Sequence, residues 1–332
     1  MKTITEALPV IDLKGPARDT SVRRGIARQL DHAFTATGFC YITNTGVPPA
    51  LVRSVFAMSR RFHALGPEEK ARVSINAQHR GYMAPKTSLI ETSSVAKVTQ
   101  PNLSESFMVL HEVAPTDARY GTAIHGPNQW PTLPGFRAAV QQYDAAMETL
   151  ARDVLRLMAV ALGQPEMALD QYFNQPTTWL RLLHYPPQPV DSPNDQFGSA
   201  PHTDYGCFTI LAQDEHGGLQ VRTRNGQWID ATPLADTFVV NVADMLSLWS
   251  GGRWPSTPHR VVNRTSHERF SVPYFFDMDL DTCVSPLPGT AKSDGGSSES
   301  TNALEMIRYG DYVMERLNRN YRYRRQGDSK QV

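Results

Sequence analysis

Pro201-His202-Thr203-Asp204-Tyr205-Gly206 places a histidine and an aspartate one residue apart in the half of the chain that is richest in strand-like segments. A second histidine follows in Ser256-Thr257-Pro258-His259-Arg260-Val261-Val262. Imidazole nitrogens and carboxylate oxygens are both ligands of divalent transition metals. His202, Asp204 and His259 are therefore candidate ligands of one metal ion.

Two histidines and one carboxylate can occupy one face of an octahedral ion and leave three positions open. This facial set is typical of non-haem Fe(II) oxygenases, which need the open positions for O2 and an organic co-substrate. Shortly after His259, Arg269-Phe270-Ser271 adds a guanidinium and a hydroxyl that strand alternation places on one face. Such a pair can hold a carboxylate.

Each fragment alone is weak, because short His-x-Asp and Arg-x-Ser patterns are common and a lone histidine is more often structural. Their joint order favours the iron site. A zinc hydrolase is a weaker interpretation, since it leaves Arg269 and Ser271 without a function. A non-catalytic small-molecule binder on a jelly roll is the alternative from outside the enzymes.

Around these motifs, short period-two segments separated by Gly, Pro, Asn and Asp predict a β-sandwich or barrel. These segments are residues 179–185, 207–213, 218–222, 227–230, 238–242, 259–262 and 270–276. Helical spacing predicts a helix over 20–37 that Gly38 ends, another after Pro48 and a long one over 136–162. A last helix is expected over 309–321.

Two segments show no regular pattern. Residues 74–129 are rich in Ser, Thr, Pro and Gly, and they are long for a loop in a compact domain. They either have a function, such as a lid, or contain short elements. Residues 289–301 are rich in Ser and Gly and predict a flexible insert, which is a second candidate lid.

The composition excludes several classes of protein. The 332 residues include 33 Lys and Arg against 33 Asp and Glu, which argues against nucleic acid or an anionic membrane as partner. No apolar run approaches the roughly 18 residues of a membrane span. Three widely spaced cysteines and a start without a signal peptide predict a cytoplasmic protein. The oligomeric state cannot be read from these features.

With these motifs in place, the sequence resembles the iron- and 2-oxoglutarate-dependent oxygenases of the isopenicillin N synthase-like group. The resemblance covers most of the chain. Beyond the metal set, it includes Gly38-Phe39-Cys40-Tyr41-Ile42-Thr43-Asn44-Thr45-Gly46-Val47, Arg80-Gly81-Tyr82, Glu105-Ser106-Phe107, Asn128-Gln129-Trp130-Pro131, Leu180-Arg181-Leu182-Leu183-His184-Tyr185-Pro186-Pro187, Gly217-Gly218-Leu219-Gln220-Val221 and Asn241-Val242-Ala243-Asp244-Met245-Leu246.

The resemblance implies a mainly β protein with flanking helices, of the α+β class. Its core would be a distorted double-stranded β-helix, or jelly roll, wrapped by N-terminal helices. We expect an N-terminal mixed region over 1–118, the long helix and jelly-roll core over 119–288, and the insert with the C-terminal helix over 289–332.

The same resemblance implies the chemistry. His202, Asp204 and His259 match the iron ligands, Arg269 and Ser271 match the pair that binds the distal carboxylate of 2-oxoglutarate, and Tyr185 matches a tyrosine that assists there. O2 and 2-oxoglutarate would give succinate, CO2 and a ferryl species that hydroxylates or desaturates a small metabolite. An oxidase or an ethylene-forming-type reaction is the alternative within the family.

Two positions depart from the family pattern. Thr45 stands where many relatives have histidine in an Asn-His-Gly turn, and this turn is expected to be structural and remote from iron. Leu183 stands where plant relatives have asparagine, which can alter how the co-substrate is contacted.

Strand parity extends the prediction to the substrate. If Tyr185 points into the barrel, Leu183 and Arg181 share its face, and Phe275 shares the face of Arg269. Tyr205 should border the iron. Arg181 could pair with a carboxylate or polar heterocycle of the substrate, or form an internal salt bridge. The identity of the substrate is not specified.

Other aromatic and imidazole side chains are expected to be structural. Trp249 is predicted to pack in the core, and His184 should face away from the iron. The histidines without a second ligand at useful spacing are expected at the surface or in structural roles: His32, His63, His79, His111, His125, His216 and His267.

Overall fold

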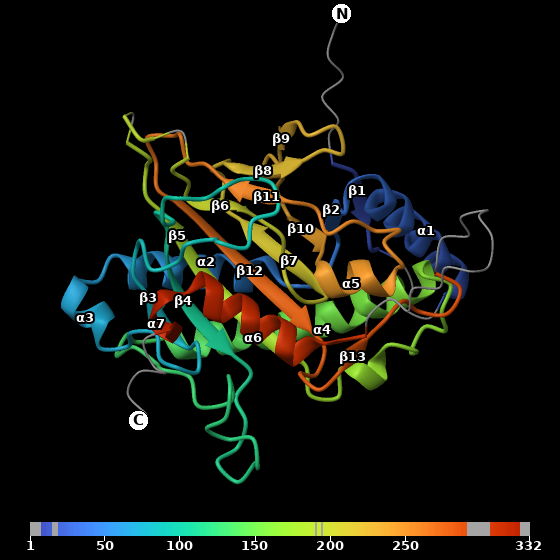
Figure 1. Ribbon diagram of the computed structural model, residues 1–332, viewed down its shortest axis with the longest axis horizontal. Coiled ribbons are helices and arrows are strands. Elements are labelled where there is room, and N and C mark those ends of the chain that lie inside the picture. Colours follow the sequence, from blue (N-terminus) through green and yellow to red (C-terminus); the bar gives the residue numbers. More distant parts are fainter. Residues whose placement is uncertain (1–7, 15–18, 190, 194, 291–305, 326–332) are drawn as a thin grey trace, which may run out of the picture.

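The computed structural model of the protein describes residues 8–14, 19–189, 191–193, 195–290 and 306–325. Most of the predicted flexible insert, residues 291–301, lies outside the described residues. Two sheets face each other at the centre of the molecule, and helices lie on both sides of them (Figure 1).

The strands form the predicted jelly roll. In the described part of the chain, the larger sheet has the order β1 (Val10–Asp12), β2 (Phe39–Thr43), β10 (Thr237–Val242), β7 (Phe208–Gln213), β12 (Arg269–Asp277), β5 (Thr177–Tyr185), β4 (Glu105–Leu110) and β3 (Gly81–Met83). The smaller sheet has the order β6 (Ser199–His202), β11 (His259–Val261), β8 (Leu219–Arg222) and β9 (Trp228–Asp230). From β5 to β12 the chain passes back and forth between the two sheets, so the predicted fold class is confirmed.

Three helices cover the outer face of the larger sheet. They are α1 (Thr20–Thr37), α2 (Pro49–His63) and α4 (Phe136–Ala161), close to their predicted bounds. Helix α4 packs against α1, α2 and β12, and its predicted apolar stripe is buried, including Val140, Tyr143, Met147, Leu150, Val154 and Met158. Gly38 ends α1 with φ 72°, and a side chain there would meet the Pro255 carbonyl at 2.4 Å.

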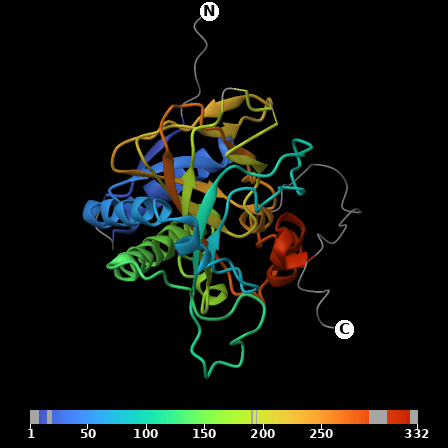
Figure 2. The same ribbon diagram turned by 90° about the vertical axis from the view of Figure 1, so that its left-hand side faces the viewer.

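The irregular segment 74–129 contains short elements, as one of its two interpretations required. Strand β4 is buried along its whole length and lies between β3 and β5. Because both of its faces are covered, it lacks the alternation that would identify it. The connection from β4 to α4 extends away from the sheets (Figure 2).

Several short elements were not predicted. They are α3 (Pro67–Ala71), the 3-10 helix η1 (Asp170–Tyr172), β6, α5 (Asp244–Trp249), β13 (Cys283–Val284) and β14 (Ile307–Arg308). Strand β6 contains Pro201, which weakens its sequence signal. Trp249 is buried in the core, as expected.

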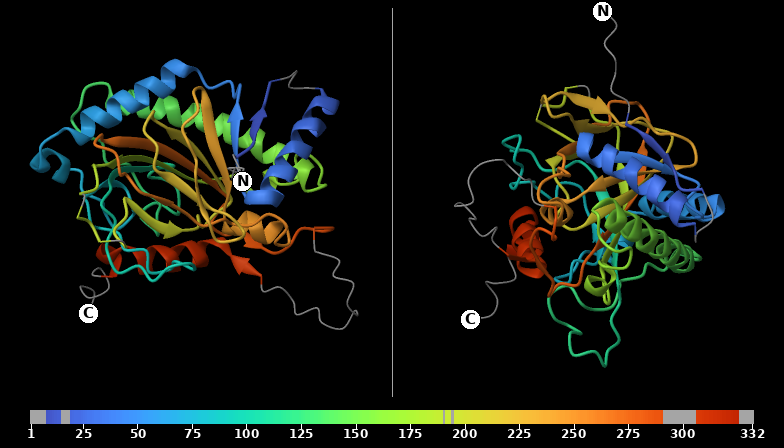
Figure 3. Two further views of the ribbon diagram at one scale, coloured as in Figure 1. Left: turned by 90° about the horizontal axis from the view of Figure 1, so that it is seen from above. Right: turned by 90° about the vertical axis from the view of Figure 1, so that its right-hand side faces the viewer.

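The C-terminal helices lie on the other side of the sheets. Helix α6 (Tyr309–Asn320) matches its prediction and is followed by α7 (Arg322–Arg325). Figure 3 shows the sheets between α4 on one side and α6 on the other. Among the described residues, no helix combines the length and apolarity needed to cross a membrane.

Candidate active site

The three predicted metal ligands lie together at one end of the smaller sheet. His202 ends β6 and is directly paired with His259 at the start of β11, while Asp204 lies in the turn after β6. Asp204 Oδ1 is 3.7 Å from Nε2 of His202 and 3.6 Å from Nε2 of His259. One ligand atom from each residue lies within 4.8 Å of the others, which suits one bound ion.

Hydrogen bonds orient all three side chains toward this centre. Nδ1 of His202 lies 2.7 Å from the Ala200 carbonyl, and Nδ1 of His259 lies 3.2 Å from the Thr257 carbonyl. A carbonyl oxygen only accepts, so each Nδ1 donates and each Nε2 keeps a free lone pair. These contacts hold both imidazoles ready to bind a metal.

The carboxylate is oriented in the same way. Asp204 Oδ2 accepts a hydrogen bond from the Thr209 hydroxyl at 2.5 Å and another from the Asn241 amide at 2.7 Å. Its Oδ1 is thereby left facing the two histidines. Neither Thr209 nor Asn241 was singled out from the sequence, although Asn241 belongs to a motif that carries the family resemblance.

The charge state of the set also suits a divalent cation. Burial, together with the nearby His259, lowers the pKa of His202 to about 4, so the imidazole is neutral at pH 7. Burial acts to raise the pKa of Asp204, but His259, His202 and the two hydrogen bonds outweigh it and lower that pKa. Two neutral nitrogens and one anionic oxygen fit Fe(II).

A buried guanidinium lies in the same cavity as the triad. Arg269 has no exposed surface, and only its Nη2 has a hydrogen-bond partner among the described residues, the Gln213 side chain at 3.1 Å. Its Nε and Nη1 are buried without such a partner. Unpaired buried donors on a cation are costly, so they fit an anionic group such as a carboxylate.

Two further predicted residues adjoin Arg269. Its guanidinium lies 4.8 Å from the centre of the Tyr185 ring, and Tyr185 is directly opposite Arg269 in the β5–β12 ladder. Ser271 pairs with Leu183 in the same ladder, and all four residues line one cavity with the metal triad. We call this the clamp cavity.

A second cavity adjoins the clamp cavity, with about 670 Å³ of empty space that includes open solvent. We call it the aromatic cavity, because Trp179, Tyr205, Phe275 and Tyr321 line it. Arg181, Phe275 and the metal ligands His202 and Asp204 line both cavities. Of the predicted substrate residues, Leu183 lines the clamp cavity instead.

Arg181 has no acidic partner in the part of the chain that the structure describes. Its Nε donates to the Ser106 hydroxyl at 2.9 Å, and its Nη2 lies 3.5 Å from the Met83 sulfur. Among the described residues, no carboxylate lies within ion-pair distance of it, so the alternative of an internal salt bridge is not supported. Nη1 remains available to a ligand.

Several residues of the aromatic cavity were not predicted from the sequence. His79, Asn102, Tyr309 and Tyr321 come from loops and the C-terminal segment, far along the chain from the iron motif. No local pattern joins them to it. His79 was expected in a surface or structural role, but it is buried and lines this cavity.

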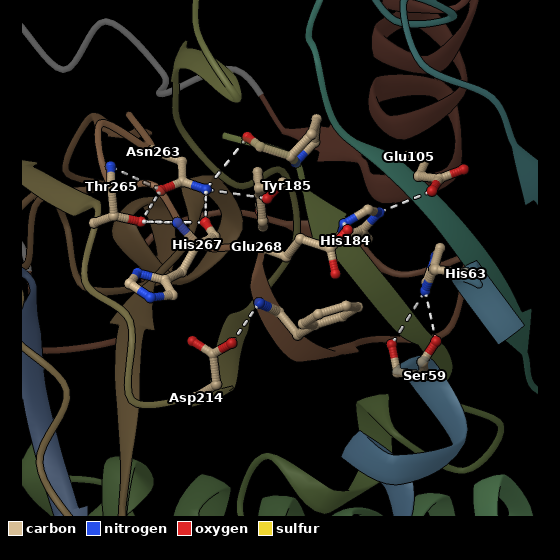
Figure 4. A network of polar contacts seen from close by, with 12 residues as sticks. Ser59, His63, Glu105, His184, Tyr185, Asp214, Asn263, Thr265, His267 and Glu268 are labelled. Atoms are coloured by element: carbon tan, nitrogen blue, oxygen red, sulfur yellow. Dashed lines mark hydrogen bonds and ion pairs between the residues drawn. The ribbon is translucent and has the colours of Figure 1, made fainter. Parts of the chain in front are cut away.

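His184 does not line the clamp cavity, whereas its neighbours Leu183 and Tyr185 do, and it belongs to the polar network drawn in Figure 4. Its Nδ1 lies 2.8 Å from Glu105 Oε1, and its ring stacks on Phe270 at 4.7 Å. His63 lies beside it and hydrogen-bonds through Nδ1 to the Ser59 carbonyl. These side chains support the back of the strands that carry Arg269 and Tyr185.

Two families match the chain. Residues 176–278 match the 2OG-Fe(II) oxygenase superfamily, and residues 8–133 match the non-haem dioxygenase in morphine synthesis N-terminal family. Homoarginine-6-hydroxylase 2-ODD-C23 of Glycine max is 34% identical over 97% of this chain and 99% of its own. The 2-oxoglutarate-dependent dioxygenase citB of Monascus ruber is 34% identical over 95% of each chain.

Solved structures agree with these matches. A full-length Neurospora crassa protein in complex with alpha-KG and thymine is 30% identical, with a TM-score of 0.79 over 96% of this chain and 98% of that one. The same fungal protein has been solved with alpha-KG and 5-formyluracil, at 31% identity. Together with the triad and the buried arginine, these similarities show that the chain belongs to the 2OG-Fe(II) oxygenases, enzymes that use Fe(II) and 2-oxoglutarate.

Proposed function

We propose that this enzyme oxidises a C–H bond of a small planar molecule that carries a carboxylate or a ring carbonyl. The observation that carries this proposal is Arg181, a guanidinium that has no acidic partner among the described residues and lies in the aromatic cavity beside the metal ligands. Hydroxylation or desaturation would follow from where the bound molecule presents its C–H bond.

The proposal assigns the cofactors to particular residues. His202, Asp204 and His259 would hold the iron, while Arg269 and Ser271 would hold the distal carboxylate of 2-oxoglutarate. Tyr185 would support Arg269 through the face of its ring. When bound, iron would activate O2, and 2-oxoglutarate would give two electrons to O2 as it is decarboxylated to succinate and CO2, which leaves the oxidising power for one substrate C–H bond.

The aromatic cavity would position the substrate. Trp179, Tyr205 and Phe275 provide flat apolar walls, which suit a planar ring and displace water from the reacting bond. Arg181 would fix the orientation of the ring through an acceptor oxygen. Since Arg181 also lines the clamp cavity, a substrate held there lies next to the metal site.

The lining of the cavity disfavours a cationic substrate. Two carboxylates line it, and both are already engaged. Asp204 belongs to the metal set, and Asp277 accepts hydrogen bonds from the Cys207 backbone at 2.7 Å, the Tyr309 hydroxyl at 2.7 Å and the Trp179 indole at 3.1 Å. A guanidinium or ammonium group would find no free acidic partner there among the described residues.

The relatives support the choice of substrate class. Thymine and 5-formyluracil, the ligands of the Neurospora crassa protein, are planar rings with carbonyl acceptors. Homoarginine, named for other relatives, carries a carboxylate that Arg181 could also bind, but its guanidinium end lacks a partner here. The planar, acceptor-bearing molecule therefore fits the cavity better.

A succinate-release screen tests this proposal. The panel contains aromatic carboxylates and ring lactams, each paired with an analogue that lacks the acceptor, and homoarginine as a flexible cationic comparison. We expect only acceptor-bearing rings to accelerate succinate release. Acceleration by homoarginine alone, or by the acceptor-free analogues equally, would contradict the proposed substrate class.

The ratio of products tests the reaction type. A hydroxylase or desaturase forms one succinate for each substrate oxidised, whereas an ethylene-forming-type reaction fragments 2-oxoglutarate itself. We expect the one-to-one ratio, measured by chromatography of both products. Ethylene in the headspace, with less succinate than 2-oxoglutarate consumed, would point to the alternative.

The proposal also includes the subgroup of the family, the cellular compartment and the organisation of the chain. We assign the enzyme to the isopenicillin N synthase-like group and to the cytoplasm, where the free thiols of Cys40, Cys207 and Cys283 would remain reduced. We also keep the three-part organisation over 1–118, 119–288 and 289–332. Fractionation of cells and limited proteolysis test the compartment and the boundaries.

A further inference from the structure

His79 lies in a loop whose shape is strongly constrained. Its backbone has φ 62°, an uncommon conformation for a residue other than glycine, and its amide donates to the Asn76 carbonyl at 3.0 Å. The next residue, Arg80, is buried and donates to the carbonyls of Leu110, His111 and Ile124 and to the Asn128 side chain. Such over-determined backbone conformations are concentrated at functional sites.

The imidazole of His79 is part of the wall of the aromatic cavity. It is 1% exposed, and its ring meets Tyr321 edge-on at 4.7 Å and Trp179 at 5.6 Å. Arg181 lines the same cavity. The imidazole and the guanidinium are therefore positioned to contact one small ligand together.

The hydrogen bonding of Nδ1 determines what His79 offers to that ligand. The Tyr323 hydroxyl contacts Nδ1 of His79. The hydroxyl can donate its proton to Nδ1, whose lone pair then accepts it. The imidazole proton is then on Nε2, which has no partner among the described residues.

The charge state agrees with this tautomer. Burial, with Arg324 and Arg181 nearby, lowers the pKa of His79 well below its usual value. The ring is therefore neutral at pH 7, with one donor nitrogen. Protonation would place a third positive charge beside two arginines.

We propose that His79 is a specificity-determining residue. Arg181 holds one acceptor of the substrate, and the Nε2–H of His79 donates to a second acceptor of the same molecule. This inference rests on the proposed function, because it requires the substrate to occupy the aromatic cavity. It narrows the substrate class to planar molecules with two acceptors. A molecule with a single acceptor would leave a buried donor unpaired.

Matched ring pairs test the inference. Benzoate is compared with 3-acetylbenzoate, which adds one carbonyl acceptor in an acetyl group, and 2-pyridone with uracil, which adds one carbonyl acceptor and one ring N–H. Dissociation constants are measured anaerobically by calorimetry on the enzyme with Fe(II) and 2-oxoglutarate. We expect the two-acceptor member of at least one pair to bind about ten- to hundredfold more tightly than its partner.

Two variants of nearly equal shape separate donation from packing. Asparagine and aspartate both tolerate the left-handed backbone of position 79, but only asparagine can donate. His79→Asn should keep a preference for the two-acceptor member, and His79→Asp should remove it. Thermal unfolding temperatures serve as the folding control, and the affinity for 2-oxoglutarate should stay unchanged in both variants.

The outcomes separate this inference from the proposed function. If neither acceptor-bearing ring binds, or if Arg181→Ala binds them as well as wild type, the proposed function fails. If rings bind through Arg181 but wild type does not prefer the two-acceptor member of either pair, the proposed role of His79 is wrong. It is also wrong if His79→Asp keeps that preference.

The tautomer can be measured without any variant. Nitrogen-15 spectra of the histidine side chains in the protein loaded with Zn(II), a diamagnetic substitute, should show His79 neutral and protonated at Nε2 between about pH 5.5 and 8. A proton on Nδ1, or a charged ring in this range, would overturn the inference.

Discussion

The clamp cavity and the aromatic cavity share the metal ligands His202 and Asp204 but are built in different ways. The clamp cavity is formed by paired strands, in which Arg269 is opposite Tyr185 and Ser271 is opposite Leu183. The aromatic cavity adds side chains from a loop, such as His79, and from the C-terminal segment, such as Tyr321. The paired strands thus hold the residues for 2-oxoglutarate, which the oxidation of any substrate would need. Separate segments supply the residues that would select among substrates.

The largest loss of activity is expected from a change at the metal site, which both cavities adjoin. His202→Ala removes one of three metal ligands, so we expect loss of stoichiometric Fe(II) binding and of all 2-oxoglutarate decarboxylation. Iron content and succinate release measure these losses. His267→Ala, which removes an exposed histidine stacked on His216, is the matched control and should behave as wild type. Equal activity in wild type and His202→Ala would disprove the metal assignment.

The next effect should be confined to the clamp cavity. Arg269→Ala removes the buried cation, so we expect the KM for 2-oxoglutarate to rise about hundredfold. This rise is at the lower end of the affinity losses that follow when one partner of a buried ion pair is removed. Arg269→Lys keeps the charge without the planar fork and should recover only part of the affinity. The affinity for the substrate should change little. A rise in the substrate KM with an unchanged 2-oxoglutarate KM would reverse the roles of the two cavities.

The converse effect should be confined to the aromatic cavity. Arg181→Ala should raise the KM for an acceptor-bearing substrate by about ten- to hundredfold and leave the KM for 2-oxoglutarate unchanged. We also expect slow decarboxylation uncoupled from substrate oxidation to persist. Oxygen consumption and product formation, measured together, give the coupling ratio. If the variant simply unfolds at lower temperature and loses both activities, Arg181 is structural.

The same contrast explains what could be predicted from sequence. His202, Asp204 and Arg269 lie in short motifs on or beside strands, where spacing and parity determine which side chains meet. His79 and Tyr321 are brought together only by the packing of the C-terminal segment against a loop, which no local pattern encodes. For the same reason, the four long helices and the strands from β5 to β12 other than β6 were predicted, whereas β4, buried on both faces, was not.

The smallest effect on catalysis should come from the network behind the clamp cavity. Glu105 accepts hydrogen bonds from Lys70 at 2.9 Å, from His184 at 2.8 Å and from the Tyr82 hydroxyl. Burial opposes ionisation, but these partners prevail and lower the pKa of Glu105 from 4.5 to about 2. The ionised carboxylate therefore stabilises the folded protein at pH 7.

The sign of the pH dependence follows from this depressed pKa. The stabilisation is complete above about pH 4.5 and is lost as the pH falls toward 2, by roughly 3 kcal/mol in the free energy of unfolding. Glu105→Gln should remove this part of the acid dependence and destabilise the protein at pH 7, because Lys70 loses its buried partner. Urea unfolding between about pH 7 and pH 3 measures both effects.

A matched control and the kinetics complete this test. Glu268→Gln, at an exposed carboxylate 3.4 Å from His184, should change stability by less than about 0.5 kcal/mol. Because Glu105 faces away from both cavities, the KM values of Glu105→Gln for 2-oxoglutarate and substrate should stay close to wild type at pH 7, where the variant is still folded. A large rise in its 2-oxoglutarate KM alone would instead show that the network positions Arg269 through β5 and β12.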